Sequence, residues 1–449
     1  MKSHRNRNPL SRRAILATPA SLLAASLLLA GCSSGSPSSA EGTESGSGET
    51  ATSEKLTVVV EGGGKAELEP IAAAFKDETG VDVELVELPY DGLYERISTE
   101  LSSGKLSFDV AALDAIWLSA FAEGMASLDD VMTEDVQEDL FPALVEEAQV
   151  DGRFVGIPVW TNAQVLFYRT DLFEDPEEKA AFEKEYGYEL AAPTTWDEYG
   201  DIAKFFTRDS DGDGTIDLYG TDVKGAVETE WLAMITQAGS DSVVLGPNNE
   251  VIVNDEAHKK ALDAYIAPLT AGSTPGGASQ IDWNEAQNLF NQGQTAMTRF
   301  WAHAYPQIPE DSPVYGNVGV AQMPAGERFG AIPGAWYLSI PAAAGDNPTA
   351  KEFLAFTVEH NDLALDTSLG LAATVSALES AAGKPGKEHL AVLIDTLNAP
   401  GTISRPANEN WQQIVDTVLI PTLQAATQPG ADTQALLDEA HDKIVEIIK

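Results

Sequence analysis

The chain has 449 residues, of which 70 are acidic and 27 basic, and its formal net charge at pH 7 is −43. Binding to phosphate backbones needs clustered Lys and Arg, so this charge excludes nucleic acid as a partner. A single cysteine excludes a disulfide framework. The length exceeds what one hydrophobic core usually serves, so we expect two lobes.

Residues 1–31 have the three regions of a secretory signal peptide. An apolar stretch at residues 14–30 is too short and too interrupted to span a bilayer well. It ends in Leu29-Ala30-Gly31-Cys32, which resembles the lipobox of bacterial lipoproteins, where the thiol takes a diacylglyceryl group. We therefore expect cleavage before Cys32 and a lipid on Cys32; the alternative is an uncleaved signal anchor. The basic start of this segment consists of Lys2, Arg5, Arg7, Arg12 and Arg13.

Residues 32–54 follow as a predicted tether. They are rich in Ser, Gly and Thr, with acids making up much of the rest, and such a composition is typical of a flexible linker. Together with the lipid on Cys32, this tether predicts a protein anchored to the outer face of the cell membrane, which contacts the membrane through its lipid only.

The body of the chain alternates short β-rich runs with amphipathic stretches. This alternation is typical of layered α/β lobes, and we found no internal repeat. A capping box at residues 195–198, in which Thr195 precedes Glu198 by three positions, starts a later helix. The first predicted elements are strands at residues 56–60, 81–88 and 108–113 and helices at residues 68–79 and 90–103.

An acidic, glycine-containing loop at residues 209–217 predicts a structural calcium site. Its oxygen-bearing residues fall at positions 1, 3, 5, 7 and 9, and glycine stands at position 6, as in a calcium loop of the EF-hand type. Position 12 is Gly220 instead of the usual glutamate, so another carboxylate or water would complete the shell. The alternative is an acidic surface turn without metal. The predicted ligands are Asp209, Asp211, Asp213, Thr215 and Asp217.

The eight tryptophans are the main clue to a ligand, because most lie near strand ends or turns. A pyranose has an apolar C–H face that lies flat on an indole, while its hydroxyls need convergent polar groups. For each single tryptophan, packing in a core is an equally good interpretation.

Several segments, taken in order, resemble the extracellular solute-binding proteins of ABC importers, in particular the large sugar-binding class that includes maltose-binding protein. The resemblance covers the chain from about residue 56 to about residue 425. Its pieces are residues 74–80 (AFKDETG), 108–110 (FDV), 156–158 (GIP), 167–172 (FYRTDL), 193–198 (PTTWDE), 295–298 (TAMT), 319–324 (GVAQMP) and 334–341 (GAWYLSIP).

The resemblance implies an α/β fold of two lobes that close on a ligand, with crossing segments near residues 162–166, 332–336 and 371–376. One lobe would comprise residues 55–163 and about 337–373, and the other about 164–336 and 374–449. The protein would capture a carbohydrate, with an oligosaccharide expected, and deliver it as a monomer to an ABC permease. It would not be an enzyme and would need no catalytic cofactor.

The resemblance also places the ligand site. Trp301 and Trp411 match positions of stacking aromatics in the family, and Trp160 with Asn162 matches the first crossing. The charged residues of the family are not reproduced one for one, and the glycines after Glu61 replace a charged loop, which implies a different sugar. The full predicted set is Glu61, Asp114, Trp117, Trp160, Asn162, Glu228, Trp231, Trp301, Trp336 and Trp411.

Two other classes of function remain open from the sequence. An exported glycoside hydrolase would also carry tryptophans and acids, but it needs two carboxylates set across a cleft. A binder of a polyamine or a peptide would use an acidic cleft, with the aromatics serving cation–π contacts.

Overall fold

The computed structural model describes residues 55–209 and 212–449. The predicted signal peptide, Cys32, the tether, Ser210 and Asp211 lie outside the described residues. Of the described residues, those from 55 onward fall within a single compact unit, Thr52–Lys449. Within that part of the chain, no helix combines the length and the apolar character needed to cross a membrane.

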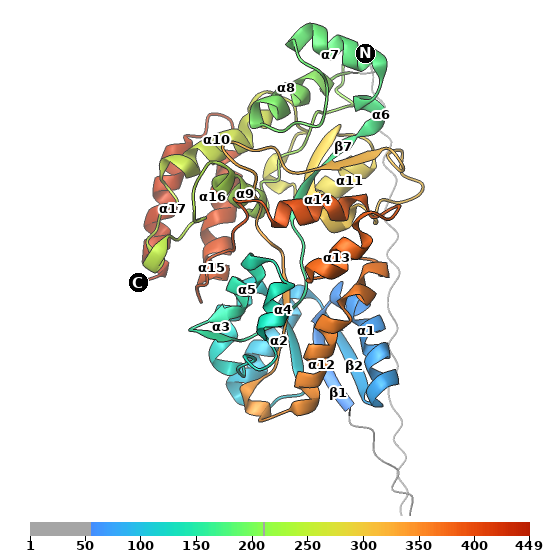
Figure 1. Ribbon diagram of the computed structural model, residues 1–449. Coiled ribbons are helices and arrows are strands. Elements are labelled where there is room, and N and C mark those ends of the chain that lie inside the picture. The colour runs from blue at the N-terminus through green and yellow to red at the C-terminus, as the bar shows by residue number, and fades with distance from the viewer. Residues whose placement is uncertain (1–54, 210–211) are drawn as a thin grey trace, which may run out of the picture. The chain divides into compact units, whose positions relative to one another are not determined.

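Two main sheets organise the described residues (Figure 1). The larger sheet has the strand order β2-β1-β3-β10-β6, with β1 parallel to β2 and β3 and with β10 antiparallel to β3 and β6. The smaller has the order β8-β7-β9, and both of its pairings are antiparallel. The strands are β1 (Lys55–Glu61), β2 (Asp82–Leu88), β3 (Val110–Asp114), β4 (Gln149–Val150), β5 (Arg153–Phe154), β6 (Ile157–Trp160), β7 (Gln164–Arg169), β8 (Met297–Trp301), β9 (Val318–Ala321) and β10 (Trp336–Ser339).

Helices surround both sheets and form the two-lobed α/β fold (Figure 1). Helices α1 to α5 and α12 lie with the larger sheet, and most of the others lie with the smaller one. The helices are α1 (Gly64–Thr79), α2 (Tyr90–Ser103), α3 (Leu118–Phe121), α4 (Glu134–Glu138), α5 (Pro142–Ala148), α6 (Thr170–Phe173), α7 (Pro176–Tyr186), α8 (Trp196–Phe206), α9 (Thr229–Gln237), α10 (Glu256–Thr270), α11 (Trp283–Asn291), α12 (Pro348–Glu359), α13 (Val375–Ala382), α14 (Glu388–Leu397), α15 (Trp411–Ile414), α16 (Ile420–Ala426) and α17 (Thr433–Ile447).

The early elements agree with the sequence prediction. The first three strands and the helix at 90–103 are confirmed within two residues at each end, and α1 begins four residues earlier than expected, at Gly64. The capping box is confirmed, because the Thr195 hydroxyl accepts from the Glu198 N–H while the Glu198 carboxylate accepts from the Thr195 N–H. Local signals therefore suffice for these elements.

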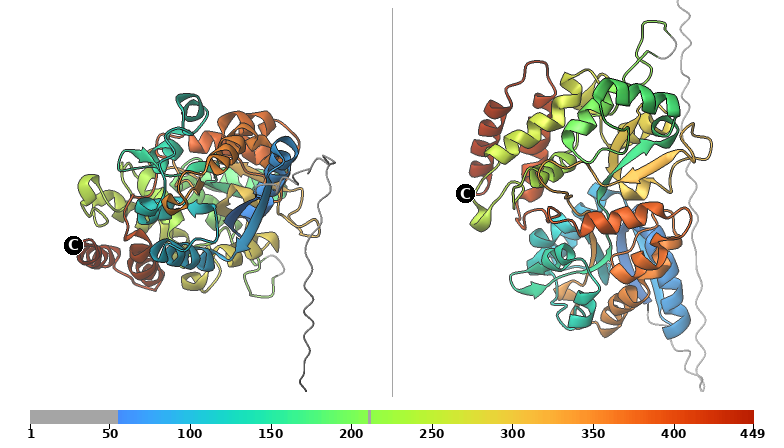
Figure 2. Two further views of the ribbon diagram at one scale, coloured as in Figure 1. Left: turned by 90° about the horizontal axis from the view of Figure 1, so that it is seen from below. Right: turned by 45° about the horizontal axis from the view of Figure 1, so that its top comes forward.

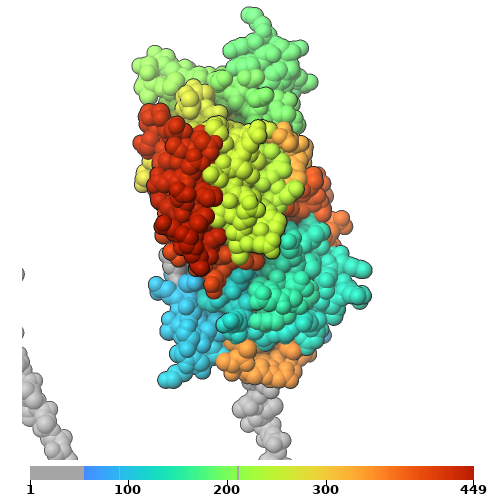
Figure 3. Space-filling model, turned by 90° about the vertical axis from the view of Figure 1, so that its left-hand side faces the viewer, coloured from blue at the N-terminus to red at the C-terminus, as the bar shows by residue number. Residues whose placement is uncertain are grey.

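Segments distant in sequence complete each lobe. Residues 348–366, orange in Figures 1 and 2, pack beside the blue helix α1, where Phe75 makes edge contacts with Phe353 and Phe356. On another face, the red helix α17 lies beside α10, yellow-green in Figure 3. The larger core includes Val58, Leu68 and Phe353, and a separate cluster includes Leu232, Leu262 and Leu437.

Two of the three expected passages between the sheets lie near their predicted positions. Residues 161–163 join β6 of the larger sheet to β7 of the smaller, and residues 322–335 join β9 back to β10. The Gly334 N–H donates to the Asn162 carbonyl at 2.8 Å, so these two connections run side by side. The residue bounds given above for the lobes stay a prediction.

Candidate functional site: a tryptophan-lined cavity

One edge of the larger sheet gathers four of the predicted residues. Glu61 ends β1, Asp114 ends β3 and Trp160 ends β6, while Trp336 begins the antiparallel strand β10. In register, Trp336 stands between Asp114 on one side and Trp160 on the other. Since ligands of α/β proteins bind at the carboxyl ends of the strands, this edge is the natural floor of a site.

A cavity of about 270 Å³ lies over this edge. Its wall combines three indoles with polar side chains and two leucines. The lining residues are Glu61, Gly63, Asp114, Trp160, Asn162, Trp301, His303, Gly334, Trp336, Leu369, Leu371 and Arg405.

The three lining tryptophans are held by close packing. The Trp160 and Trp336 rings stack with centroids 5.7 Å apart and planes at 24°. Trp301 comes from β8, and a Cβ on Gly334 would lie 2.7 Å from its ring, so only glycine admits the indole there. Gly64 has the same relation to Trp160, with a distance of 2.3 Å.

Asp114 and Arg405 form the main charged pair of the wall. An Arg405 Nη2–H donates to Asp114 Oδ1 at 3.2 Å, and the Tyr90 hydroxyl donates to Asp114 Oδ2 at 3.0 Å. The Arg405 side chain is 9% exposed. Burial alone would lower its pKa, but Asp114, Glu147 and Glu228 raise it above the ordinary arginine value, so the guanidinium stays charged.

Two carboxyls near this pair have raised pKa values. Burial raises the pKa of Glu147 to about 7, although the Arg405 charge and a hydrogen bond from the Tyr337 hydroxyl oppose the rise. Burial also raises the pKa of Glu61, against the Gly63 N–H that donates to its Oε2 at 3.1 Å.

Asn162 and His303 supply the uncharged polar groups. Burial lowers the pKa of His303 to about 4, so at neutral pH its imidazole is uncharged. Its Nδ1 can then accept from the Asn162 side-chain N–H at 2.7 Å. This pair links the first crossing to the end of β8 and presents hydrogen-bonding groups without charge.

The structure brings six of the ten predicted ligand residues to the cavity: Glu61, Asp114, Trp160, Asn162, Trp301 and Trp336. Glu228 does not line it; this side chain is buried, and burial raises its pKa near the Arg405 and Asp114 charges. Trp117 is also buried and lies behind the wall, where its ring contacts Tyr90 and Trp336.

Trp231 and Trp411 are placed differently from what the sequence suggested. Both are 0% exposed and belong to the separate core cluster. All nine residues of α9 are buried, so Trp231 has core neighbours on every side. Trp411 begins α15 and packs among residues of the same cluster. These two indoles have the burial of packing residues and lie in the core cluster instead of the cavity wall.

The sequence prediction missed six lining residues: Gly63, His303, Gly334, Leu369, Leu371 and Arg405. Some signals were present: His303 follows Trp301 by two positions, and Gly334 and Leu371 fall within the expected crossings at 332–336 and 371–376. Arg405 lies in an irregular segment between α14 and α15, and nothing in its neighbourhood marks it as part of a site.

The calcium prediction is untested, because Asp211 lies outside the described residues. Among the residues described, Asp209 accepts from the Gly212 and Gly214 N–H groups at 2.6 and 2.7 Å, and Asp213 accepts from the Thr215 N–H at 2.7 Å. Within residues 55–209 and 212–449, no three His, Cys, Asp or Glu side chains converge as a metal site.

Comparison with known proteins gives a consistent result. A family model for bacterial extracellular solute-binding proteins matches residues 46–360. A probable ABC transporter-binding protein of Deinococcus radiodurans is 29% identical over 64% of this chain and 67% of its own. A maltooligosaccharide ABC transporter solute-binding lipoprotein of Streptococcus pneumoniae is 25% identical over 82% of each chain. The chain matches between 59% and 82% of the length of such relatives.

Solved structures share the fold. An ABC transporter solute-binding protein of Agrobacterium radiobacter K84 in complex with ribitol is 26% identical, with a TM-score of 0.69 over 88% of this chain and 98% of that one.

Proposed function

Because the chain belongs to the bacterial extracellular solute-binding proteins, we propose that it captures a neutral carbohydrate in the tryptophan-lined cavity and delivers it to an ABC permease. The observation that carries this proposal is the wall itself, in which Trp160, Trp301 and Trp336 stand beside Asp114 and Arg405. Indole faces suit the C–H face of a sugar ring, and the charged pair suits its hydroxyls.

The charge of the wall favours a neutral ligand over a cation. Arg405 is buried and charged, so a polyamine in the cavity would meet a fixed positive charge. The carboxylate of Asp114 already has Arg405 and Tyr90 as partners. Hydroxyls can join such a network without adding charge, whereas an ammonium group would bring a second positive charge beside Arg405.

The cavity volume favours a small carbohydrate. Sites for drug-sized ligands measure roughly 300–1,000 Å³, and this cavity measures about 270 Å³. We therefore expect a sugar alcohol or a sugar of one or two rings to fit. The family resemblance implied an oligosaccharide without a length, and a disaccharide is the shortest of these. The ribitol complex of the Agrobacterium relative supports this smaller size class.

A screen of thermal stability tests the proposal. Sugar alcohols, monosaccharides, disaccharides and trisaccharides are added in turn, and a ligand at 100 times its dissociation constant should add about 2.7 kcal/mol to the free energy of unfolding. We expect the largest midpoint shift within the first three classes. A largest shift with spermidine would favour the polyamine alternative. Cleavage of a bound sugar on long incubation, seen by chromatography, would favour the hydrolase.

We further propose that the protein is held at the outer face of the membrane by a lipid on Cys32. Support comes from the lipobox resemblance and from the family, whose members act outside the cytoplasm. Expression of wild type and Cys32→Ser tests this. Detergent phase separation should place the wild type in the detergent phase and Cys32→Ser in the aqueous phase, and equal partitioning would exclude the anchor.

A further inference from the structure

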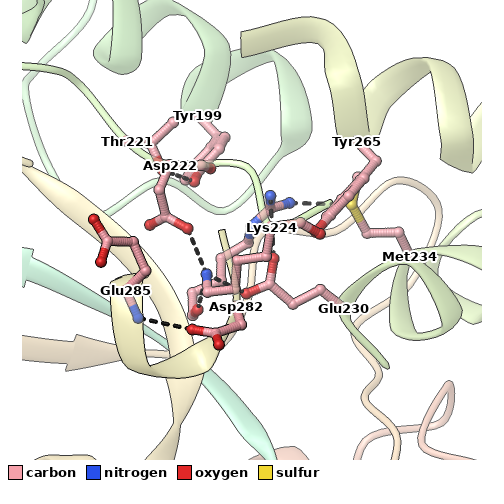
Figure 4. Close-up of polar contacts among 10 residues, drawn as sticks. Tyr199, Thr221, Asp222, Lys224, Glu230, Met234, Tyr265, Asp282 and Glu285 are labelled. Atoms are coloured by element: carbon pink, nitrogen blue, oxygen red, sulfur yellow. Dashed lines mark hydrogen bonds and ion pairs between the residues drawn. The ribbon is translucent and has the colours of Figure 1, made fainter. Parts of the chain in front are cut away.

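Asp222, Lys224, Glu230 and Arg299 form a cluster of four buried charges, of which the first three are labelled in Figure 4. Lys224 Nζ donates to Asp222 Oδ2 at 2.6 Å and to Glu230 Oε1 at 2.7 Å. Arg299 Nη2 lies 3.4 Å from Glu230 Oε2. All four residues are at most 3% exposed. The cluster holds two cations and two carboxylates, so its charges balance.

Stability alone does not account for this arrangement. Removing four charges from water costs several kcal/mol per ion, and apolar residues of similar volume would often serve stability equally well. Partners of opposite charge nevertheless raise the pKa of Lys224 against the effect of burial, so the ammonium stays charged. We expect such a buried ionic cluster to hold the groups around it in a fixed arrangement.

The cluster fixes the strand that carries Trp301. Lys224 Nζ also donates to the Arg299 carbonyl at 2.8 Å, two residues before Trp301 on β8. β8 is an edge strand of its sheet, so this carbonyl gains a partner from outside the sheet. The Arg299 guanidinium lies over two rings, with its central carbon 5.2 Å from the centroid of Tyr199 and 5.0 Å from that of Tyr265. Both the main chain and the side chain of residue 299 are therefore held.

A second connection runs through Trp283. Lys224 Nζ lies 5.5 Å from the centre of the Trp283 ring, within the range of a cation–π contact. The Trp283 ring in turn packs on Trp301 with centroids 5.5 Å apart and planes at 54°. Lys224 thus supports the Trp301 indole from behind as well as through its strand.

We propose that the cluster of Asp222, Lys224, Glu230 and Arg299 positions Trp301 in the cavity wall, with Lys224 as the central positioning residue. That this wall receives a sugar rests on the proposed function, but the positioning itself does not. Removal of Lys224 together with Asp222 leaves the Glu230 and Arg299 pair neutral, so the fold can persist while Trp301 loses both connections.

Fluorine NMR of protein labelled with 5-fluorotryptophan tests the proposal without any ligand. The Trp301 resonance is assigned by its loss in Trp301→Phe. Trp117, a residue of the larger core whose ring contacts Tyr90, Tyr94 and Trp336, serves as an internal reference. In Lys224→Met with Asp222→Asn, we expect the Trp301 resonance to shift and to broaden or split, while the Trp117 resonance stays in place. An unchanged Trp301 resonance in this folded double variant contradicts the proposal.

The control is Lys76→Met with Asp82→Asn, which makes the same two changes in an exposed pair at 2.7 Å. It should leave the Trp301 resonance as in wild type. If the double variant fails to fold, Lys224→Arg is used in its place, because it keeps the buried positive charge. Because the larger guanidinium cannot keep the same contacts with the Arg299 carbonyl and the Trp283 ring, the Trp301 resonance should still shift. No shift there overturns the proposal.

A binding measurement extends the test to function, with the best sugar from the thermal screen as probe. A lost aromatic contact corresponds to up to about a tenfold loss of affinity. We expect that loss in Lys224→Met with Asp222→Asn and wild-type affinity in the exposed-pair control. Wild-type affinity in the cluster variant counts against positioning. If wild type binds no sugar, the proposed function fails, and the NMR comparison still decides on the cluster.

Discussion

Trp301 and Trp411 were indistinguishable in the sequence, and the structure separates them. Trp301 lines the cavity and keeps part of its surface exposed, whereas Trp411 is fully buried in a core cluster. Tryptophan serves both settings, because its large ring packs well and also stacks on ligands. Which setting applies depends on tertiary contacts that no local pattern reports.

The two residues should respond differently to truncation. Trp411→Ala should cost roughly 3–5 kcal/mol of unfolding free energy, as for other buried aromatics. Trp301→Ala should lower the unfolding midpoint less and should weaken sugar binding about tenfold, since it removes a stacking surface. Denaturation without ligand and calorimetric titration with it measure both effects. Equal loss of midpoint in the two variants, with affinity unchanged in Trp301→Ala, would move Trp301 out of the site.

Arg405 illustrates what residue-level patterns cannot reveal. It lies in an irregular segment, and its role depends on Asp114 and Glu147, which stand more than 250 positions earlier in the chain. The sequence predicted the acid at 114 because that residue ends a recognisable strand. The partner of the acid could be found only once the fold had brought the two segments together.

At the scale of elements, strand ends were the most predictable part of the site. Glu61 and Asp114 each follow a strand whose carboxyl end could be predicted from the sequence, whereas Trp160 was placed by the family resemblance. The sheet brings these three strand ends to one edge. The opposite wall depends on β8, which is paired antiparallel in a different sheet. Residues after that strand, such as His303, were therefore missed.

Helix α1 is tied to the segment that carries Leu369 and Leu371 by a buried carboxyl. Glu67 is 0% exposed, and burial raises its pKa to about 7, although hydrogen bonds from Thr367 and from the backbone of residues 369–371 oppose the rise. The folded-state pKa thus lies above the ordinary value of 4.5. The neutral form is favoured in the fold, so ionisation of Glu67 costs stability.

Linkage gives the direction of the pH effect. The Glu67 contribution is fully present below about pH 4.5 and is lost as the pH rises through about 7. Each unit of pKa shift is worth about 1.4 kcal/mol, so the effect is of the order of 3 kcal/mol at most. The test measures the free energy of unfolding of wild type and Glu67→Gln at pH 5 and pH 8. From pH 5 to pH 8 this free energy should fall more in the wild type than in the variant. An equal change in the two proteins would contradict the raised pKa of Glu67.

We also propose that the loop at residues 209–217 binds calcium, because its oxygen-bearing residues have the spacing that a hard cation needs. Calcium should raise the melting midpoint of chelator-treated wild type and leave Asp211→Ala with Asp213→Ala unchanged. Magnesium at the same ionic strength is the control for screening of charge. A wild-type midpoint that does not respond to calcium would favour the alternative, an acidic surface turn without metal.

At the scale of the whole molecule, the order of weak segments predicted the fold better than any one segment did. The positions of the crossings followed from that order, and the structure has its connections between the two sheets near residues 162 and 332–335. Ligand size could not be predicted, because it depends on how closely the two walls approach. That approach is set by side chains such as Trp301 and Arg405, which come from different elements.

A crystal structure with the best sugar from the thermal screen tests the central claim most directly. The account predicts one or two sugar rings, or an extended sugar alcohol, in the cavity, with a C–H face against Trp301 or Trp336 and a hydroxyl bonded to Asp114 or Arg405. Sugar density at another place on the protein, with this cavity holding only water, would contradict it.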